Sequence, residues 1–332
     1  MADVTDSKCQ TSQFEICNTV CHTPIENNSM SPKHGIVCLL CLLLTSLVAC
    51  QRQSELTNGD YAGYFDKATE ELVCFNFPVS YDMFADLLEV IPADHELYYR
   101  SLFAKATCAQ HITPPTQELL DEATKLFEQV ASECPDKNLA GRAIINLGRI
   151  AELRDYPGDI IDLDTARKYY QQLIDTYPNE DLADEAILWK AGTYIQVVGD
   201  KQSKEQGVTM LEDWLAKRPD NAFASPMWTY LGQTYELELD NPQRSLECYI
   251  KADKIGLPAE SSISAFYWRM AIMAQKIPSQ LDTCVKYYQK IIKITPTSGR
   301  AFEAKLALDE LAKAHPEKNI QVPEIELYQI GQ

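Results

Sequence analysis

The stretch ARKYYQQLIDTYP, residues 166–178, contains the pattern that decides the fold of the chain. A small residue, Ala166, is followed four positions later by Tyr170 and after three more by Leu173, and Pro178 comes five positions after that. Offsets of four and seven place these side chains on one face of an α-helix, and the proline marks where the helix stops. The stretch therefore predicts an amphipathic helix that ends just before Pro178.

The same spacing recurs along the chain, with the closing prolines 38 to 43 residues apart. Its other copies are Ser80-Phe84-Leu87-Pro92, Ala123-Phe127-Val130-Pro135, Gly207-Leu211-Trp214-Pro219, Ser245-Tyr249-Ala252-Pro258 (one residue late) and Cys284-Tyr288-Ile291-Pro296. Ahead of three copies, residues 182–199, 223–239 and 262–277 are apolar at helical spacing and predict a first helix for each pair. One pair cannot bury its apolar face alone, whereas pairs stacked at a fixed period can, so the chain is predicted to be an all-α solenoid.

One first helix carries a known repeat signature. Trp228, Leu231, Gly232 and Tyr235 match W-x2-L-G-x2-Y, and the chain here resembles the tetratricopeptide repeat family. The neighbouring copies supply their own small residue at Gly148, Gly192 and Ala271. The resemblance implies a tetratricopeptide-like α-solenoid of about six helix pairs over residues 61–316. A C-terminal capping helix at 299–316 is expected to close it, before an extended tail at 317–332 that folds back through Ile325, Leu327 and Tyr328.

An apolar run from Ile36 to Ala49 stops at Cys50, with polar sequence beyond it. A bilayer span needs about 20 apolar residues, so this run is too short, but it fits the h-region of a secretory signal, roughly 7 to 15 residues. Leu47-Val48-Ala49-Cys50 resembles the lipobox of bacterial lipoproteins, which implies cleavage before Cys50 and a lipid on its thiol. The alternative is an ordinary signal whose cysteine is incidental.

These features predict how the N-terminal part of the chain is divided. Residues 30–49 are expected to be the signal peptide, starting at Met30, and residues 50–60 a lipidated linker. Residues 1–29 are polar and are interpreted either as an over-long gene start or as a short cytoplasmic leader.

Composition excludes some classes of partner. The formal net charge is −18, which argues against nucleic acid, because phosphate neutralisation needs clustered Lys and Arg. A chain this acidic has no polybasic patch to bind anionic lipids, so membrane attachment would have to come from the lipid on Cys50. Of 11 cysteines, those beyond Cys50 are widely spaced and show no zinc-like pairing. We expect them to be free and buried as small hydrophobes, although an exported protein could oxidise a pair.

The sequence offers no catalytic signature. It contains no G-x-G-x-x-G, P-loop, G-x-S-x-G or H-E-x-x-H motif. The histidines of the mature chain, His95, His111 and His315, are too scattered for a ligand set. The chain is therefore predicted to be no enzyme and to need no cofactor or metal.

The resemblance also implies a binding groove. First helices line the concave face of the tetratricopeptide fold, and if Trp228 is a core tryptophan, the next residue and the one four later face the groove. Copy by copy, this rule selects Ile145 and Arg149, Trp189 and Thr193, Thr229 and Gln233, and Trp268 and Ile272. Arg149, Trp189, Thr193, Gln233 and Trp268 are the candidate peptide-binding residues, and the groove suits an extended apolar or neutral peptide. The alternative is that Trp189 and Trp268 simply pack between neighbouring helices.

The repeat sequence ARKYYQQLIDTYPNEDLADEAILWKAGTYIQ, residues 166–196, most resembles periplasmic lipoproteins, including the outer-membrane barrel-assembly type. This resemblance implies a non-catalytic scaffold, lipid-anchored in the bacterial outer membrane and facing the periplasm. Its expected partners are other envelope proteins or extended peptides. Gln51, where many inner-membrane lipoproteins have aspartate, favours the outer membrane. The alternatives are a periplasmic accessory protein or enzyme subunit that uses the repeats only for docking, and a coupling of the membrane to the cell wall.

Overall fold

The computed structural model describes residues 59–257 and 263–325. The chain divides into two units, residues 1–64 and residues 65–332, and the described residues belong to the second unit except for residues 59–64. Cys50, the predicted signal peptide, Pro258, Leu327 and Tyr328 lie outside the described residues.

The described residues form thirteen α-helices and contain no strand. The helices are α3 (Tyr61–Val73), α4 (Phe77–Val90), α5 (Tyr98–His111), α6 (Gln117–Glu133), α7 (Lys137–Glu152), α8 (Leu163–Thr176), α9 (Asp181–Ile195), α10 (Lys201–Lys217), α11 (Ala224–Leu237), α12 (Pro242–Ile255), α13 (Ile263–Gln275), α14 (Leu281–Ile294) and α15 (Gly299–Ala314). Short 3-10 turns lie at Pro278–Gln280 and Pro316–Lys318.

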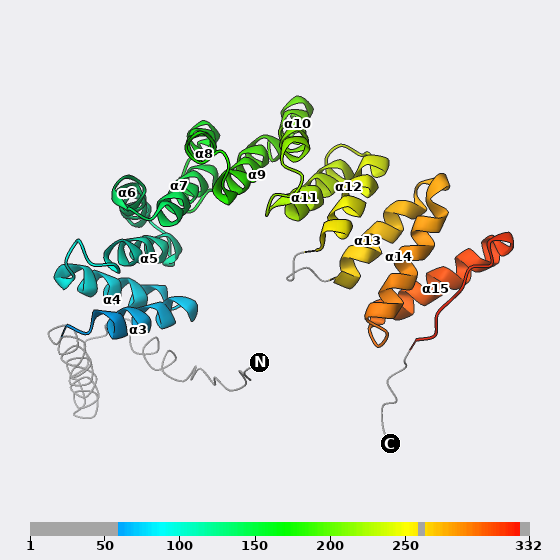
Figure 1. Cartoon of the computed structure of the whole chain (residues 1–332), viewed down its shortest axis with the longest axis horizontal. Coiled ribbons are helices and arrows are strands. Elements are labelled where there is room, and N and C mark those ends of the chain that lie inside the picture. The colour runs from blue at the N-terminus through cyan, green and yellow to red at the C-terminus, as the bar shows by residue number, and fades with distance from the viewer. Residues whose placement is uncertain (1–58, 258–262, 326–332) are drawn as a thin grey trace, which may run out of the picture. The chain divides into compact units, whose positions relative to one another are not determined.

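Odd-numbered helices are the first members of six pairs, even-numbered helices are the second members, and α15 stands alone after the last pair. Every helix from α4 to α14 packs against the helix that follows it in the chain (Figure 1). Packing between chain neighbours is the defining property of a solenoid. The predicted fold, a tetratricopeptide-like α-solenoid of six pairs with a capping helix, is confirmed.

The repeated spacing in the sequence marks the core of the second helices. Phe84, Phe127, Tyr170 and Tyr249 are fully buried at the aromatic position, and Leu211 takes that position in α10. Within the described residues, each second helix whose closing proline is visible ends two residues before it, as α8 does at Thr176 before Pro178. The prolines therefore end the helices as predicted.

Two glycines let the paired helices approach closely. A Cβ atom on Gly148 would lie 2.5 Å from the Tyr170 ring, and one on Gly232 would lie 2.5 Å from the Tyr249 ring. Real Cβ atoms do not come this close to other heavy atoms, so each tyrosine fills the space that the missing side chain leaves. Gly192 occupies the same repeat position, but its nearest neighbour would be the Tyr230 hydroxyl at 3.6 Å.

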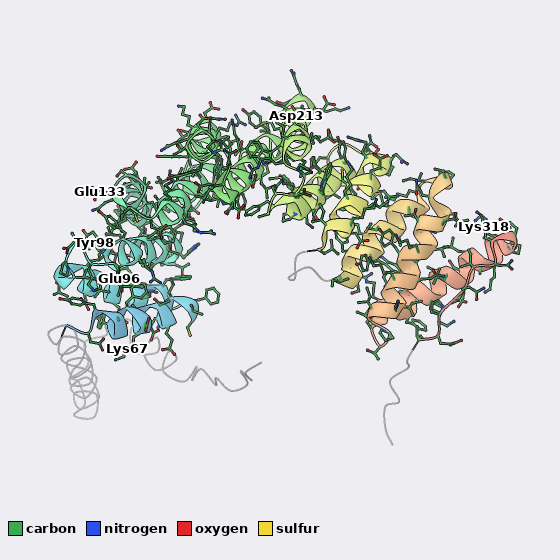
Figure 2. The ribbon with its side chains drawn as sticks, in the orientation of Figure 1. Lys67, Glu96, Tyr98, Glu133, Asp213 and Lys318 are labelled. Carbon is green, nitrogen blue, oxygen red and sulfur yellow. The ribbon has the colours of Figure 1, made fainter. Side chains whose placement is uncertain are left out.

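The chain after α15 closes the C-terminal end of the stack. Ile320, Val322 and Ile325 pack against the hydrophobic cluster built by α12, α13, α14 and α15. The Gln289 side chain donates a 2.7 Å hydrogen bond to the carbonyl oxygen of Gln321. Lys318, labelled in Figure 2, lies 3.5 Å from Asp282. Residues 319–325 contain no regular secondary structure, and the expected tail at 317–332 stays a prediction.

The described part of the chain contains five cysteines, all of them free. Cys108, Cys248 and Cys284 are buried, as expected for small hydrophobes, and Cys134 is half-buried. Cys74 is exposed instead, because it lies in the turn between α3 and α4. Among the described helices, none is both long enough and apolar enough to cross a membrane.

Candidate peptide-binding surface

Two neighbouring first helices, α7 and α9, present one connected set of side chains. On α7, Arg142 and Arg149 are seven residues apart and therefore share a face; on α9, Glu185 and Trp189 are four apart and share another. The two helices are in contact with each other. We call Arg142, Arg149, Glu185 and Trp189 the α7–α9 strip.

The strip is held by contacts within each helix and between the two helices. The Arg142 guanidinium lies 3.9 Å from the Glu185 carboxylate, and the Trp189 indole N–H lies 3.4 Å from the same carboxylate. The Arg149 guanidinium carbon lies 4.1 Å above the Trp189 ring, within cation–π range. Arg149 also pairs with Glu152 on its own helix. Arg149 and Trp189, which the sequence placed in one groove, are thus in direct contact.

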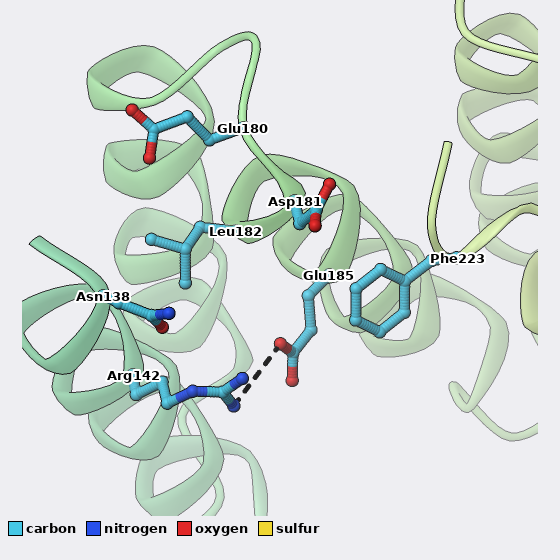
Figure 3. Close-up of a pocket in the computed structure, with 7 residues that line it drawn as sticks. All are labelled: Asn138, Arg142, Glu180, Asp181, Leu182, Glu185 and Phe223. Carbon is cyan, nitrogen blue, oxygen red and sulfur yellow. Dashed lines mark ion pairs between the residues drawn. The ribbon is translucent and has the colours of Figure 1, made fainter. Parts of the chain in front are cut away.

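A pocket of about 430 Å³ opens at one end of the strip (Figure 3). Its lining combines α7, the first turns of α9 and the residue that precedes α11. The lining residues are Asn138, Arg142, Glu180, Asp181, Leu182, Glu185 and Phe223. Arg142 and Glu185 belong to both the pocket and the strip, so the two form one continuous surface. Three carboxylates, one guanidinium, an amide and a phenyl ring give this surface polar and apolar contacts side by side.

The Glu152 carboxylate, which pairs with Arg149 of the strip, is strongly desolvated. Glu152 is only 5% exposed, and burial raises the pKa of its carboxyl group, although Arg149 opposes the shift. The neighbouring Tyr170 hydroxyl is fully buried, and burial likewise raises its pKa. A charged pair in such surroundings needs both members, since removing one leaves the other unpaired. Arg149 is therefore held in place for contact with Trp189.

Thr193 lies beneath a side chain from another helix. Its side chain is fully buried, and Arg167 of α8 donates hydrogen bonds to its hydroxyl at 2.9 Å and to its carbonyl oxygen at 3.0 Å. The Thr193 hydroxyl donates in turn to the carbonyl oxygen of Lys190 at 2.7 Å. Arg167 of α8, the second helix of the preceding pair, therefore covers Thr193, which stays a prediction as a groove contact.

The remaining candidates lie on α7, α11 and α13. Ile145 is buried in the core between α7 and α9, whereas Gln233 and Ile272 are half-buried. Thr229 is also half-buried, and its hydroxyl donates to the carbonyl oxygen of Ser225 at 2.9 Å. These positions remain predictions as peptide contacts.

Trp268 on α13 is in a setting similar to that of Trp189. Its ring packs edge-on against Tyr288 at 5.2 Å, and the Arg300 guanidinium carbon of α15 lies 5.0 Å from the ring centroid. Each of the two groove tryptophans is therefore covered by an arginine from an adjacent first helix. Both rings are half-buried, so they make packing contacts and also keep some exposed surface.

Sequence reasoning missed Arg142, Glu185 and Phe223. The signal for two of them was available: Arg142 lies two helical turns before Arg149, and Glu185 lies one turn before Trp189. Extending the groove rule toward the start of each first helix would have selected them. Phe223 precedes α11 and enters the pocket only through the packing of neighbouring pairs.

A comparison with family profiles agrees with the class of fold. A tetratricopeptide repeat family profile matches residues 161–180, which include α8. A search of curated proteins gives no match. Among solved structures, the chain is similar to one titled "Assembly Chaperone of RpL4 (Acl4) (Residues 1-338)", with a TM-score of 0.44 and 11% identity, over 78% of this chain and 99% of that one.

The fold and the repeat match support a protein-interaction scaffold that binds proteins or peptides. Within the described residues, no group of three or more His, Cys, Asp or Glu side chains is placed to hold a metal ion.

Proposed function

We propose that the protein is a non-catalytic scaffold, anchored to the bacterial outer membrane by a lipid on Cys50 and facing the periplasm. Its first helices hold extended segments of other envelope proteins. The proposed anchor is supported by Leu47-Val48-Ala49-Cys50, which directly precedes the short linker to the solenoid.

One observation carries the binding part of the proposal: the pocket and the strip form a single surface across two repeats. A peptide laid across α7 and α9 would meet Phe223 and carboxylates at one end and the Trp189 ring at the other. Extended peptides bind such surfaces through a few side-chain anchors spaced along the chain. The half-buried Trp189 and Trp268 rings are the aromatic anchors of this kind that the first helices supply.

The binding test is co-purification of the tagged lipoprotein from crosslinked envelopes, with wild type beside the double variant Trp189→Ala/Trp268→Ala. A buried aromatic anchor is worth about 2 kcal/mol or more, so each ring should change affinity about thirtyfold. We expect specific partners to disappear in the double variant while its circular dichroism stays helical.

Trp228→Ala is the matched control. Trp228 is also half-buried and is covered by a cation, since Lys251 lies 3.8 Å from its ring centroid, but it occupies the core position of its repeat. The control should keep the partners. An unchanged partner list in the double variant would remove Trp189 and Trp268 from the site and leave them as packing residues.

The anchor has its own test. Metabolic palmitate labelling should occur in the wild type and vanish in Cys50→Ala. Label that persists in this variant would contradict the lipid site.

A further inference from the structure

The last residue of α3 and the turn that follows it expose three consecutive apolar or weakly polar side chains. Val73 is 69% exposed, Cys74 is exposed, and Phe75 is 78% exposed. The Phe75 ring contacts the Phe77 ring edge-on at 6.0 Å, and Phe77 in turn lies against His111 of α5 at 5.3 Å. The apolar turn, residues 73–75, therefore projects from a supported base.

Phe75 also has an unfavourable backbone conformation. Its φ is +60°, in the left-handed region where glycine or asparagine is usual and a bulky residue is an outlier. The backbone N–H of Phe75 bonds to the carbonyl oxygen of Leu72 at 3.0 Å, and that of Asn76 bonds to the carbonyl oxygen of Glu71 at 2.9 Å. These bonds form a Schellman motif, whose left-handed position favours glycine. The Asn76 side chain also donates to the Glu71 carboxylate at 2.7 Å, which fixes the turn further.

Folding gains little from a phenylalanine at this position. The ring is mostly exposed, so its burial contributes little to stability, and its backbone is strained. Strain held in place by surrounding hydrogen bonds points to a role outside folding. A rigid turn that presents Phe and Val to the outside is suited to an apolar surface.

The length of the linker between Cys50 and α3 allows the apolar turn to reach the membrane. Ten residues, 51–60, separate Cys50 from the start of α3, and an extended segment of that length spans at most about 35 Å. The thirteen residues of α3 extend about 20 Å. Because the linker is longer than the helix, it can turn back and bring the far end of α3 to the membrane that holds Cys50.

We propose that the apolar turn inserts into the lipid surface to which the chain is anchored, as a second contact beside the lipid. This inference rests on the proposed lipid anchor. The charged neighbours on α3 include Glu70 and Glu71, so the preferred surface is zwitterionic and added anionic lipid should weaken the contact.

Cys74 provides a native reporter for the test. The full lipidated chain is placed in phosphatidylcholine vesicles and treated with a charged, membrane-impermeant maleimide, and alkylation of Cys74 is measured by mass spectrometry. We expect Cys74 to react at least tenfold more slowly in the wild type than in Phe75→Asn. Asparagine tolerates the left-handed backbone, so this variant removes the ring and keeps the turn. Phe75→Trp should restore the protection.

Val198→Asn is the matched control, because Val198 is 95% exposed in another turn, between α9 and α10. It should leave Cys74 protected. Equal alkylation rates in the wild type and Phe75→Asn would overturn the inference. Loss of Cys74 protection in vesicles that carry a single copy would also overturn the inference. In that case a second copy of the chain, and not the lipid, covers the apolar turn.

Palmitate labelling of the same samples separates the two proposals. Labelled protein with an unprotected Cys74 would overturn only the insertion of the turn. Absence of label from the wild type would overturn the anchor, and the insertion with it.

Discussion

Arg218, just after α10, donates two 2.8 Å hydrogen bonds to the fully buried carboxylate of Asp184 in α9. The Trp214 indole N–H donates to the same carboxylate at 2.8 Å. A buried charge is tolerated only when its hydrogen bonds and its counter-charge are supplied. This pair therefore locks the two helices of the fourth pair together.

Arg218→Ala should destabilise the protein by about 2 to 3 kcal/mol, because the Asp184 carboxylate would stay buried without its counter-charge. Urea denaturation followed by circular dichroism measures the loss. Arg142→Ala is the control: its side chain is 56% exposed and its guanidinium lies 3.9 Å from the Glu185 carboxylate, so its removal should cost no more than about 0.5 kcal/mol. Equal losses in the two variants would contradict the role of the Asp184 pair.

Gly148→Ala and Gly232→Ala should each destabilise the protein by about 1 to 3 kcal/mol, because the new methyl group would meet a buried tyrosine ring at 2.5 Å. Gly192→Ala, at the equivalent repeat position, meets only the Tyr230 hydroxyl at 3.6 Å. Alanine favours the helix over glycine by up to about 1 kcal/mol, so this third variant should be neutral or stabilising. The melting temperatures of the three variants provide the comparison. A shift in the same direction for all three would contradict the close packing of Gly148 and Gly232 against the tyrosine rings.

Stability should fall in acid partly through Asp253. Its carboxylate accepts hydrogen bonds from Lys290 at 2.7 and 2.9 Å, from Tyr267 at 2.9 Å and from Tyr287 at 3.0 Å. Burial alone would raise its pKa, but the hydrogen bonds from Lys290 and Tyr267 outweigh burial and hold the pKa below its ordinary value. A lowered pKa contributes stability that is present above the ordinary aspartate range, near pH 4, and lost as pH falls below it.

Asp253→Asn tests this contribution. At pH 7 the variant should be less stable than the wild type by about 1 to 2 kcal/mol, and the difference should shrink below about pH 4. Urea midpoints for both proteins between pH 3 and pH 7 give the curve. A difference that stays constant down to pH 3 would exclude Asp253 as a source of the acid sensitivity.

The cysteines should differ sharply in reactivity. Burial raises the pKa of the Cys284 thiol to about 11 and that of the Cys248 thiol to about 12, and it also raises the pKa of Cys108. Since the thiolate is the reactive form, these three should resist alkylation at pH 8 until urea unfolds the chain. In detergent-solubilised protein, the exposed Cys74 should react first, as read by peptide mass spectrometry. Fast labelling of Cys248 in the folded protein would contradict its burial.

The second helices were predictable because each combines a small residue, a large apolar residue and a closing proline at fixed spacing. The helix α3 could not be recognised by itself, because its small residue, Ala68, follows Lys67, whereas the glycines of α7 and α11 each follow a leucine. The resemblance to tetratricopeptide repeats implied that Arg149 and Trp189 share a groove. Their stacking was not predictable, because it depends on how closely α7 and α9 approach. The contact of Arg167 with Thr193 was also unpredictable, since sequence spacing does not say where a long side chain from the preceding pair ends.

Packing between chain neighbours has a mechanical consequence. Among the described helices, packing joins chain neighbours and the first helices of adjacent pairs, so the distance between distant pairs is the sum of small rotations at successive interfaces. Such a chain is elastic: a partner can open or narrow the space between Trp189 and Trp268 by changing several interfaces slightly and breaking none. The stiffness of the scaffold is then set by the least rigid interface between the two rings, and strengthening that interface would restrict which partners fit.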